Sequence, residues 1–273
     1  MFEISYEICN NQVGSVPPRQ YQVQATEAQI QELTERGFFV RERLIQGELL
    51  EKLRQASDEV EAEALQNRRP GSGGGFSGLF VRDILDRHPY FLELLKFEPT
   101  LSVARAVLGP QVQIHGSVLR VAYPDLPEQG VEWHFHQRVV PRPEPAFFWR
   151  PVVLDNLIYL DDLTLDSGPL VVMPGSHLAD VDLPSGDFST KPGEVQVTVP
   201  AGSCVTSHSS LWHRALPTTP LGTKRRLVIL GYSPVWQKPI DKLSAGAGFG
   251  LTDTLIQSAD EETRELLGLT GYY

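Results

Sequence analysis

The sequence predicts a mainly β fold, a β-sandwich or barrel that α-helices precede along the chain. From Val112 onward, short apolar and β-branched runs alternate with Pro, Gly, Asp and Ser, which is typical of antiparallel sheets joined by turns. The 273 residues include 23 Gly and 21 Pro, a turn-rich composition that favours many short strands over a helical bundle. With 41% hydrophobic residues, the chain is long enough to bury a sizeable core.

The N-terminal part is predicted to be an arm followed by helices. Residues 1–24 are expected to form a short strand or an irregular arm, since Pro17 and Pro18 block a helix. Thr26 is the expected N-cap of a helix that ends at Gly37. Apolar residues at helical spacing predict further helices over 46–66, 81–96 and 98–108.

A glycine-rich segment, PGSGGGFSG at 70–78, lies between two of these helices. A phosphate-binding loop would need a strand before it and Lys-Ser or Lys-Thr after it, and neither is present. The segment is therefore predicted to be a mobile flap.

The β-rich runs are predicted to form the barrel core over residues 110–236. These runs are VQIHGSVLRVAY (112–123), PVVLDNLIYLDD (151–162), PLVVMP (169–174), EVQVTVP (194–200), SCVTSH (203–208) and RRLVILGYSP (225–234). A C-terminal extension over 237–273 is expected to be helical near 261–267 and to pack on the barrel. Together with the helical flank and flap at 1–109, the chain is predicted to be a single domain.

Charge and cysteine content restrict the partners of the protein. The formal net charge is −10, which disfavours binding to nucleic acid or to an anionic membrane. No run of 18 apolar residues predicts a membrane span, and the N-terminus lacks the pattern of a secretory signal. Two cysteines are too few for a disulfide framework, so a cytoplasmic location is expected. The oligomeric state stays open.

Three histidines carry the strongest chemical signal. In VEWHFHQR, His134 and His136 are two residues apart, so both imidazoles point to the same face of a regular strand. His213, in SHSSLWHR, supplies a remote third imidazole beside another strand-like run. Two close ligands and one distant ligand are a common way for a barrel to bind a metal. Imidazole suits Fe, Zn, Cu and Ni, so the residue type alone does not select the metal.

The surrounding motifs resemble the phytanoyl-CoA dioxygenase family. The resemblance rests on LIYLDDLTLDSGPLVVMPGSH (157–177), on the Trp-His pair before it, on LWH…RRLVILGY after it and on LTERGFFVRERLIQGELLEKLRQ (33–55). It covers roughly residues 26–236. It implies an iron(II)- and 2-oxoglutarate-dependent oxygenase on a double-stranded β-helix, a jelly-roll or cupin-like barrel. O2 and a small molecule are its implied substrates.

The resemblance also implies roles for individual residues. His134 matches the first ligand of the family's HxD motif and His213 matches its distal histidine. Arg225 matches the arginine that holds the far carboxylate of 2-oxoglutarate through paired hydrogen bonds. Leu157 lies where many members place an aromatic residue beside the cosubstrate, and Thr219 is a candidate replacement for a hydroxyl missing at Ala215. Arg226 is expected to point the opposite way, into a surface salt bridge.

One departure from the family concerns the cosubstrate. His136 occupies the position of the family's metal-binding Asp, which would give a three-histidine site with one negative charge fewer. Related barrels with three-histidine iron sites bind substrate directly and do not use 2-oxoglutarate, so such a dioxygenase is one alternative. A metal-binding homologue without catalysis is another. Glu132 and Asp155 are nearby carboxylates that would be candidate substitutes for the missing Asp.

Substrate contacts are assigned to residues around the histidines. Trp133, Tyr159, Arg138 and Phe148 are the candidates, the last within an irregular aromatic and proline-rich segment at 139–151 that is predicted to be a lid or a subunit contact. Arg120 is expected either to bind an acidic substrate or to pair with Asp161 or Asp162. If His115 faces the barrel interior, regular alternation places Arg120 on the opposite face.

Overall fold

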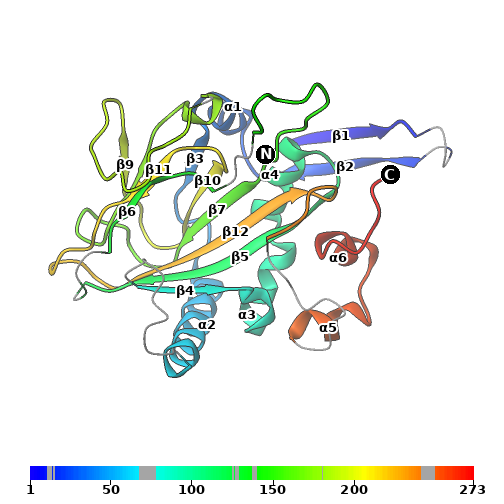
Figure 1. Cartoon of the computed structure of the whole chain (residues 1–273). Helices are drawn as coiled ribbons and strands as arrows, with labels where there is room; N and C mark the ends of the chain where they lie inside the picture. Colours follow the sequence, from blue (N-terminus) through cyan, green and yellow to red (C-terminus); the bar gives the residue numbers. More distant parts are fainter. Residues whose placement is uncertain are drawn as a thin grey trace.

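Two antiparallel sheets pack against each other in the computed structural model (Figure 1). The larger sheet has six strands in the order β3-β10-β7-β12-β5-β4, and the smaller has four in the order β6-β11-β8-β9. The structure describes residues 1–10, 14, 16–67, 78–124, 126, 129–136, 140–179, 181–240 and 250–273. The predicted mainly β jelly-roll fold is confirmed.

The predicted order of helices first and strands second holds only in part, because four strands precede or separate the N-terminal helices and two helices follow the last strand. The strands are β1 (Phe2–Ile8), β2 (Val16–Val23), β3 (Phe38–Arg41), β4 (Leu79–Arg82), β5 (Val112–Ala122), β6 (Val131–His134), β7 (Leu154–Tyr159), β8 (Leu170–Val172), β9 (Val195–Val197), β10 (Ser203–His208), β11 (His213–Ala215) and β12 (Arg225–Pro234). The helices are α1 (Glu27–Arg36), α2 (Gly47–Gln66), α3 (Pro89–Leu92), α4 (Glu98–Leu108), α5 (Leu251–Ile256) and α6 (Glu261–Leu266), with 3₁₀ turns η1 (Ile84–Asp86), η2 (Glu93–Lys96) and η3 (Ser176–Leu178).

The first helix begins and ends at the predicted residues. Thr26 and Gln29 form a reciprocal capping box, and Gly37 ends the helix with a positive φ of 84°. Any other residue at Gly37 would be strained there, and an added Cβ would also lie 2.6 Å from Nδ1 of His177.

Two predictions for the N-terminal part need correction. Residues 1–24 are not a single strand or an irregular arm, because β1 and β2 pair as an antiparallel hairpin. The expected continuous helix at 81–96 is also wrong. Its first residues belong to β4, which pairs with β5, and Pro89 restarts a short helix after a 3₁₀ turn. The glycine-rich flap predicted at 70–78 lies, except for Gly78, outside the described residues.

Both faces of the larger sheet are covered, which explains why all six residues of β7 are buried. Ile158 of β7 belongs to the main core, which α2, α4 and other flanking segments share with the sheet. Leu157 and Tyr159 point the other way, into a second core with residues of β8 and β9. The space between the two sheets is where the functional residues gather.

The C-terminal segment returns to the barrel, as expected. The predicted helix near 261–267 is α6, and Leu266 and Leu267 belong to the main core beside β5. Among the helices that the structure describes, none combines the length and apolar character needed to cross a bilayer.

Candidate metal centre

The smaller sheet brings two of the predicted ligands face to face. His134 ends β6 and His213 begins β11, and the two residues are direct partners in the antiparallel register. Their ring centroids are 4.2 Å apart. His136 lies two residues beyond His134, and its backbone N–H donates to the carbonyl of Ser209 at 2.8 Å. The register of two short strands therefore builds the cluster.

The three imidazoles converge on one point. Their candidate ligand atoms all lie within 4.8 Å of one another, and Nε2 of His136 is 3.1 Å from Nε2 of His213. The described residues contain no other cluster of three histidine, cysteine or carboxylate side chains this close together. The spacing signal in the sequence thus corresponds to a real convergence in the fold.

Hydrogen bonds fix which nitrogen of each ring carries the proton. Nδ1 of His134 lies 2.8 Å from the carbonyl oxygen of Glu132, and Nδ1 of His213 lies 2.9 Å from that of Leu211. A carbonyl oxygen only accepts, so each Nδ1 donates and each Nε2 keeps its lone pair. This is the tautomer that a metal needs at Nε2.

His136 is oriented by a carboxylate instead of a carbonyl. Its Nδ1 lies 2.9 Å from Oδ2 of Asp155, a buried residue on β7. The pair is a carboxylate–histidine arrangement like those that orient metal ligands in many proteins. Asp155 was expected as a possible ligand, and the structure places it behind the ligand instead.

The surroundings keep His134 and His213 neutral. Burial, and then the neighbouring His136, lower the pKa of His134 to about 4. Burial and the two other imidazoles also lower the pKa of His213 well below its usual value. Neutral imidazoles are ready to bind a cation without first losing a proton.

A small cavity, here called the anchor lobe, extends from the histidines toward Arg225. Its volume is about 30 Å³ and its walls are formed by Arg120, Val131, His134, His136, Leu157, Tyr159, Leu170, His213, Arg214, Ala215, Arg225, Leu227 and Ile229. Arg225 is buried, and its Nη1 donates to the carbonyl oxygen of Gly168. Burial lowers the pKa of the guanidinium.

Gly168 allows this close approach of Arg225. Its φ is +76°, and an added Cβ would lie 2.9 Å from Nη1 of Arg225 and 2.7 Å from a backbone oxygen of Leu216. Only glycine fits both the backbone conformation and the space. The SGPL part of the motif therefore has a direct structural role beside the anchor lobe.

A second cavity of about 500 Å³, here called the apolar chamber, opens from the other side of the histidines. Its walls are formed by Phe80, Arg82, His115, Gly116, Val118, Arg120, His134, Phe135, His136, Val153, Asp155, Ile229, Gly231 and Ile240. Arg120, His134, His136 and Ile229 line both cavities. The histidines thus stand between a small cavity with Arg225 and a large apolar one.

The structure brings some predicted residues to the site and leaves others away from it. Leu157 and Tyr159 line the anchor lobe. Trp133 lies on the face of β6 opposite His134, and its indole N–H donates to the carbonyl of Ser189 at 2.7 Å. Thr219 turns its hydroxyl to Asp166 at 2.7 Å.

The described part of the predicted lid segment lines neither cavity. Within the described part of 139–151, Phe148 is half-buried and lines neither cavity. Trp149 is 79% exposed and packs edge-on against Trp236. Arg138 lies outside the described residues.

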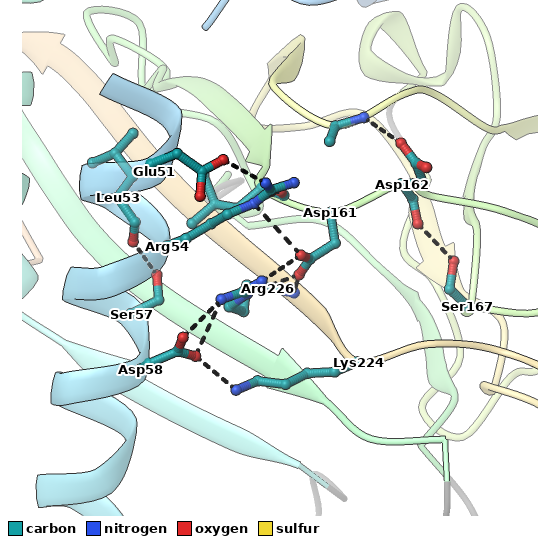
Figure 2. A network of polar contacts seen from close by, with 12 residues as sticks. Glu51, Leu53, Arg54, Ser57, Asp58, Asp161, Asp162, Ser167, Lys224 and Arg226 are labelled. Carbon is teal, nitrogen blue, oxygen red and sulfur yellow. Dashed lines mark hydrogen bonds and ion pairs between the residues drawn. The ribbon is translucent and has the colours of Figure 1, made fainter. Parts of the chain in front are cut away.

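Adjacent arginines on β12 separate as predicted. Arg226 points away from the anchor lobe and forms ion pairs with Asp161 at 2.6 Å and Asp58 at 3.0 Å, beside Lys224 and Arg54 (Figure 2). Because Asp161 is engaged there, the expected pairing of Arg120 with that carboxylate is not formed. Asp162 instead accepts the backbone N–H of Ala201.

A β-bulge overturns the predicted faces of β5. Gly116 pairs with Gly231 and Ile114 pairs with Tyr232, so His115 is the extra residue. The alternation shifts at this point, and His115 and Arg120 therefore line the same chamber.

Sequence reasoning missed Phe80 and Arg82, because both fell at the edge of the wrongly predicted helix. The available signal was the alternation of Leu79–Arg82, whose residues are in turn buried and exposed.

The double-sheet fold and the histidine centre define a barrel protein of the metal-dependent oxygenase type. The phytanoyl-CoA dioxygenase family model matches residues 33–226, and the chain belongs to this family. No curated protein sequence matches the chain closely.

Several solved structures share the fold. HygX from Streptomyces hygroscopicus, with nickel and 2-oxoglutarate bound, has a TM-score of 0.64 and 18% identity, over 81% of this chain and 91% of its own. SnoK, a non-heme α-ketoglutarate-dependent carbocyclase from nogalamycin biosynthesis, has a TM-score of 0.62 and 18% identity, over 83% and 93%. AviO1 from Streptomyces viridochromogenes Tue57 has a TM-score of 0.59 and 23% identity, over 78% and 96%.

Proposed function

We propose that the protein is an Fe(II)- and 2-oxoglutarate-dependent oxygenase that hydroxylates a small organic molecule. His134, His136 and His213 would hold the metal, and Arg225 would hold the far carboxylate of 2-oxoglutarate. The observation that carries the proposal is the convergence of the three imidazoles at the anchor lobe, with His134 and His136 also lining the apolar chamber. Family membership and the iron, nickel and 2-oxoglutarate named for HygX support the choice of metal and cosubstrate.

The donor set fits a first-row divalent metal. Three imidazoles whose Nδ1 atoms are hydrogen-bonded to oxygen atoms direct three Nε2 atoms toward one cation. When bound, Fe(II) and 2-oxoglutarate together supply the O2-dependent oxidation. The protein's own contribution is to orient the three rings and to keep His134 and His213 unprotonated.

Asp155 compensates for the carboxylate that is missing at position 136. Its Oδ2 accepts the Nδ1 proton of His136 at 2.9 Å, which makes the imidazole a better electron donor. The negative charge thus lies further from the metal than in an HxD site, because the imidazole of His136 stands between the carboxylate and the metal position. This arrangement supports a functional three-histidine site over a non-catalytic homologue.

The anchor lobe fits a dicarboxylate by charge. Among the described residues that line it are three arginines and no carboxylate. The guanidinium of Arg214 pairs with Glu194, whereas Arg120 and Arg225 are the other two. At about 30 Å³ the lobe holds roughly one water, so a five-carbon dicarboxylate requires a side-chain rearrangement. We expect Arg225 to exchange its hydrogen bond to Gly168 for paired bonds to the ligand.

Product analysis tests the proposal. Iron-loaded protein should convert 2-oxoglutarate to succinate, faster with substrate than without it. Iron-dependent O2 consumption that proceeds without any 2-oxo acid would favour the three-histidine dioxygenase that binds its substrate directly. Neither activity with any compound, despite bound iron, would favour the non-catalytic homologue.

A further inference from the structure

Asp155 uses one of its two carboxylate oxygens inside the protein. Oδ2 lies 2.9 Å from Nδ1 of His136, as described above. No residue in the described part of the chain donates a hydrogen bond to the other oxygen, Oδ1. The Asp155 side chain is only 9% exposed, so bulk water reaches it poorly. A buried carboxylate oxygen is costly when it has lost its hydration without gaining a donor, so Oδ1 is a strong candidate for a ligand contact.

This second oxygen is turned toward the apolar chamber. Asp155 of β7 pairs with Gly231 of β12, and residues opposite each other in a ladder point to the same side of the sheet. A Cβ placed on Gly231 would lie 3.1 Å from Oδ1 of Asp155. Both residues line the chamber. Because Gly231 has no side chain to cover it, Oδ1 is accessible to a ligand in the chamber.

The carboxylate is set in a mainly apolar wall. Among the described residues that line the chamber, Asp155 is the one that carries a carboxylate. A volume of about 500 Å³ lies in the range of roughly 300–1,000 Å³ of small-molecule pockets. In such pockets a few polar groups fix the orientation of a ligand that apolar contacts hold. The hydrophobic lining here consists of Phe80, Val118, Phe135, Val153, Ile229 and Ile240.

The chemistry of Oδ1 selects the polar group of the ligand. A carboxylate oxygen only accepts hydrogen bonds, so its partner must carry an O–H or N–H donor. A hydroxyl has one hydrogen to donate, and Oδ1 alone satisfies it. An ammonium group has three donors, and burying the other two against apolar side chains would be unfavourable. An alcohol is therefore the better match to this oxygen.

The position of Oδ1 also relates the ligand to the metal centre. Oδ1 belongs to the carboxylate whose Oδ2 is hydrogen-bonded to His136, and His134 and His136 both line the chamber. A hydroxyl at Oδ1 therefore lies at the end of the chamber that these histidines form. The carbon atoms next to the hydroxyl lie on the same side, and the remaining skeleton extends along the apolar lining.

We infer that the substrate of this site is a mainly apolar alcohol, whose hydroxyl donates a hydrogen bond to Oδ1 of Asp155 while Oδ2 holds His136. This inference rests on the proposed function, since it assigns the apolar chamber to the substrate and the anchor lobe to 2-oxoglutarate. Asp155 is thereby a specificity-determining residue as well as the residue that orients His136.

Calorimetric binding of borneol and of cineole to Ni(II)-loaded protein with 2-oxoglutarate tests the inference, because nickel prevents turnover. The two probes are compact bicyclic isomers, and only borneol has an O–H to donate. We expect borneol to bind about tenfold more tightly than cineole, since a hydrogen bond to a charged acceptor forms only with borneol. No borneol binding, or equal binding of the two probes, would overturn the inference. Tighter binding of bornylamine than of borneol would overturn the choice of an alcohol.

Asp155→Asn changes the hydrogen-bonding character of this contact at nearly constant size. With the amide oxygen held by His136, the amide N–H groups face the chamber and donate instead of accepting. The preference for borneol should disappear, because the ether oxygen of cineole accepts such a bond as well as a hydroxyl does. Each variant is saturated with Ni(II) before the comparison. Asp182→Asn, which removes an exposed carboxylate, is the matched control and should keep the preference.

Gly231→Ala tests the same contact without changing a polar group. The added methyl would lie 3.1 Å from Oδ1 of Asp155 and 3.2 Å from Cγ1 of Val153, so it covers the oxygen. The affinity for borneol should fall toward that for cineole. Gly271→Ala, where an added Cβ has no neighbour within 4 Å, is the matched control. An undiminished preference for borneol in Asp155→Asn and in Gly231→Ala would place the hydroxyl elsewhere and contradict the inference.

Simultaneous binding distinguishes this inference from the proposed function. Borneol and 2-oxoglutarate should bind together, because they occupy different cavities. If borneol competes with 2-oxoglutarate, or binds no better than cineole while 2-oxoglutarate binds, the inference fails and the proposed function stands. If 2-oxoglutarate does not bind but borneol keeps its preference and its dependence on Asp155, the proposed function fails and the hydroxyl site remains.

Discussion

Nδ1 of His136 lies 2.9 Å from Oδ2 of Asp155. Position 136 is a histidine where the family's HxD motif has an aspartate. Through this contact Asp155 supplies a carboxylate to the metal centre, acting through the imidazole of His136. The contact holds together two side chains that are 19 positions apart in the sequence.

We predict that Asp155→Asn weakens Fe(II) binding by about 10- to 100-fold, as expected for the loss of a carboxylate that orients a ligand histidine. Anaerobic titration with Fe(II) measures the change. Asp182→Asn removes an exposed carboxylate elsewhere and should leave the affinity unaltered.

A double variant shows whether Asp155 acts through His136. In a His136→Asp background the imidazole is absent, so Asp155→Asn should no longer weaken iron binding, and relief of repulsion between two carboxylates should favour it. Equal losses in both backgrounds would mean that Asp155 has only a structural role. His136→Asp alone should retain iron and gain 2-oxoglutarate turnover.

We predict that substitutions of Arg225 and Arg226, the neighbouring arginines of β12, have opposite effects. Arg226→Gln removes ion pairs to Asp161 and Asp58 at the protein surface (Figure 2) and should lower the free energy of unfolding by about 1–2 kcal/mol, with 2-oxoglutarate affinity unchanged. Arg225→Gln should weaken 2-oxoglutarate binding strongly. Chemical unfolding and calorimetry measure the two effects. A loss of 2-oxoglutarate affinity in Arg226→Gln would mean that the two roles are exchanged.

The pH dependence of stability should reflect His208. Burial, and then the nearby His177, lower the pKa of His208 to about 4, and its Nδ1 accepts the backbone N–H of Ser210 at 3.0 Å. The unfolded chain binds a proton near pH 6.5 while the folded chain does not. Stability is therefore complete above pH 6.5 and is lost as the pH falls toward 4.

Between pH 7 and pH 5 this histidine should cost about 1–2 kcal/mol of the free energy of unfolding. Urea unfolding of metal-free protein at the two pH values measures the loss. His208→Gln should show a smaller loss, and a variant with the same loss as the parent would refute the assignment.

Much of this site follows from local sequence patterns, and the rest depends on strand pairing. Spacing places His134 and His136 on one face, and the SGPL motif marks the turn beside Arg225. The partnership of His136 with Asp155 depends on how β7 lies beside the cluster, which no local pattern specifies. Arg120 lies on the face opposite to the predicted one because of the β-bulge at His115. The two-residue periodicity of a regular strand does not predict a bulge.

The helix wrongly predicted at 81–96 has a similar origin. Apolar residues in this segment are spaced acceptably for a helix, but Leu79–Arg82 finds a partner in the exposed edge of β5. Tertiary pairing therefore overrides the local preference and brings Phe80 and Arg82 to the chamber.

The most direct test of the account is the visible charge-transfer band of anaerobic Fe(II)-loaded protein after addition of 2-oxoglutarate. We predict that the band forms, that it is lost in Arg225→Ala and that it persists in Arg226→Ala. Stoichiometric iron without any band in the parent protein would contradict the assignment of 2-oxoglutarate to this centre.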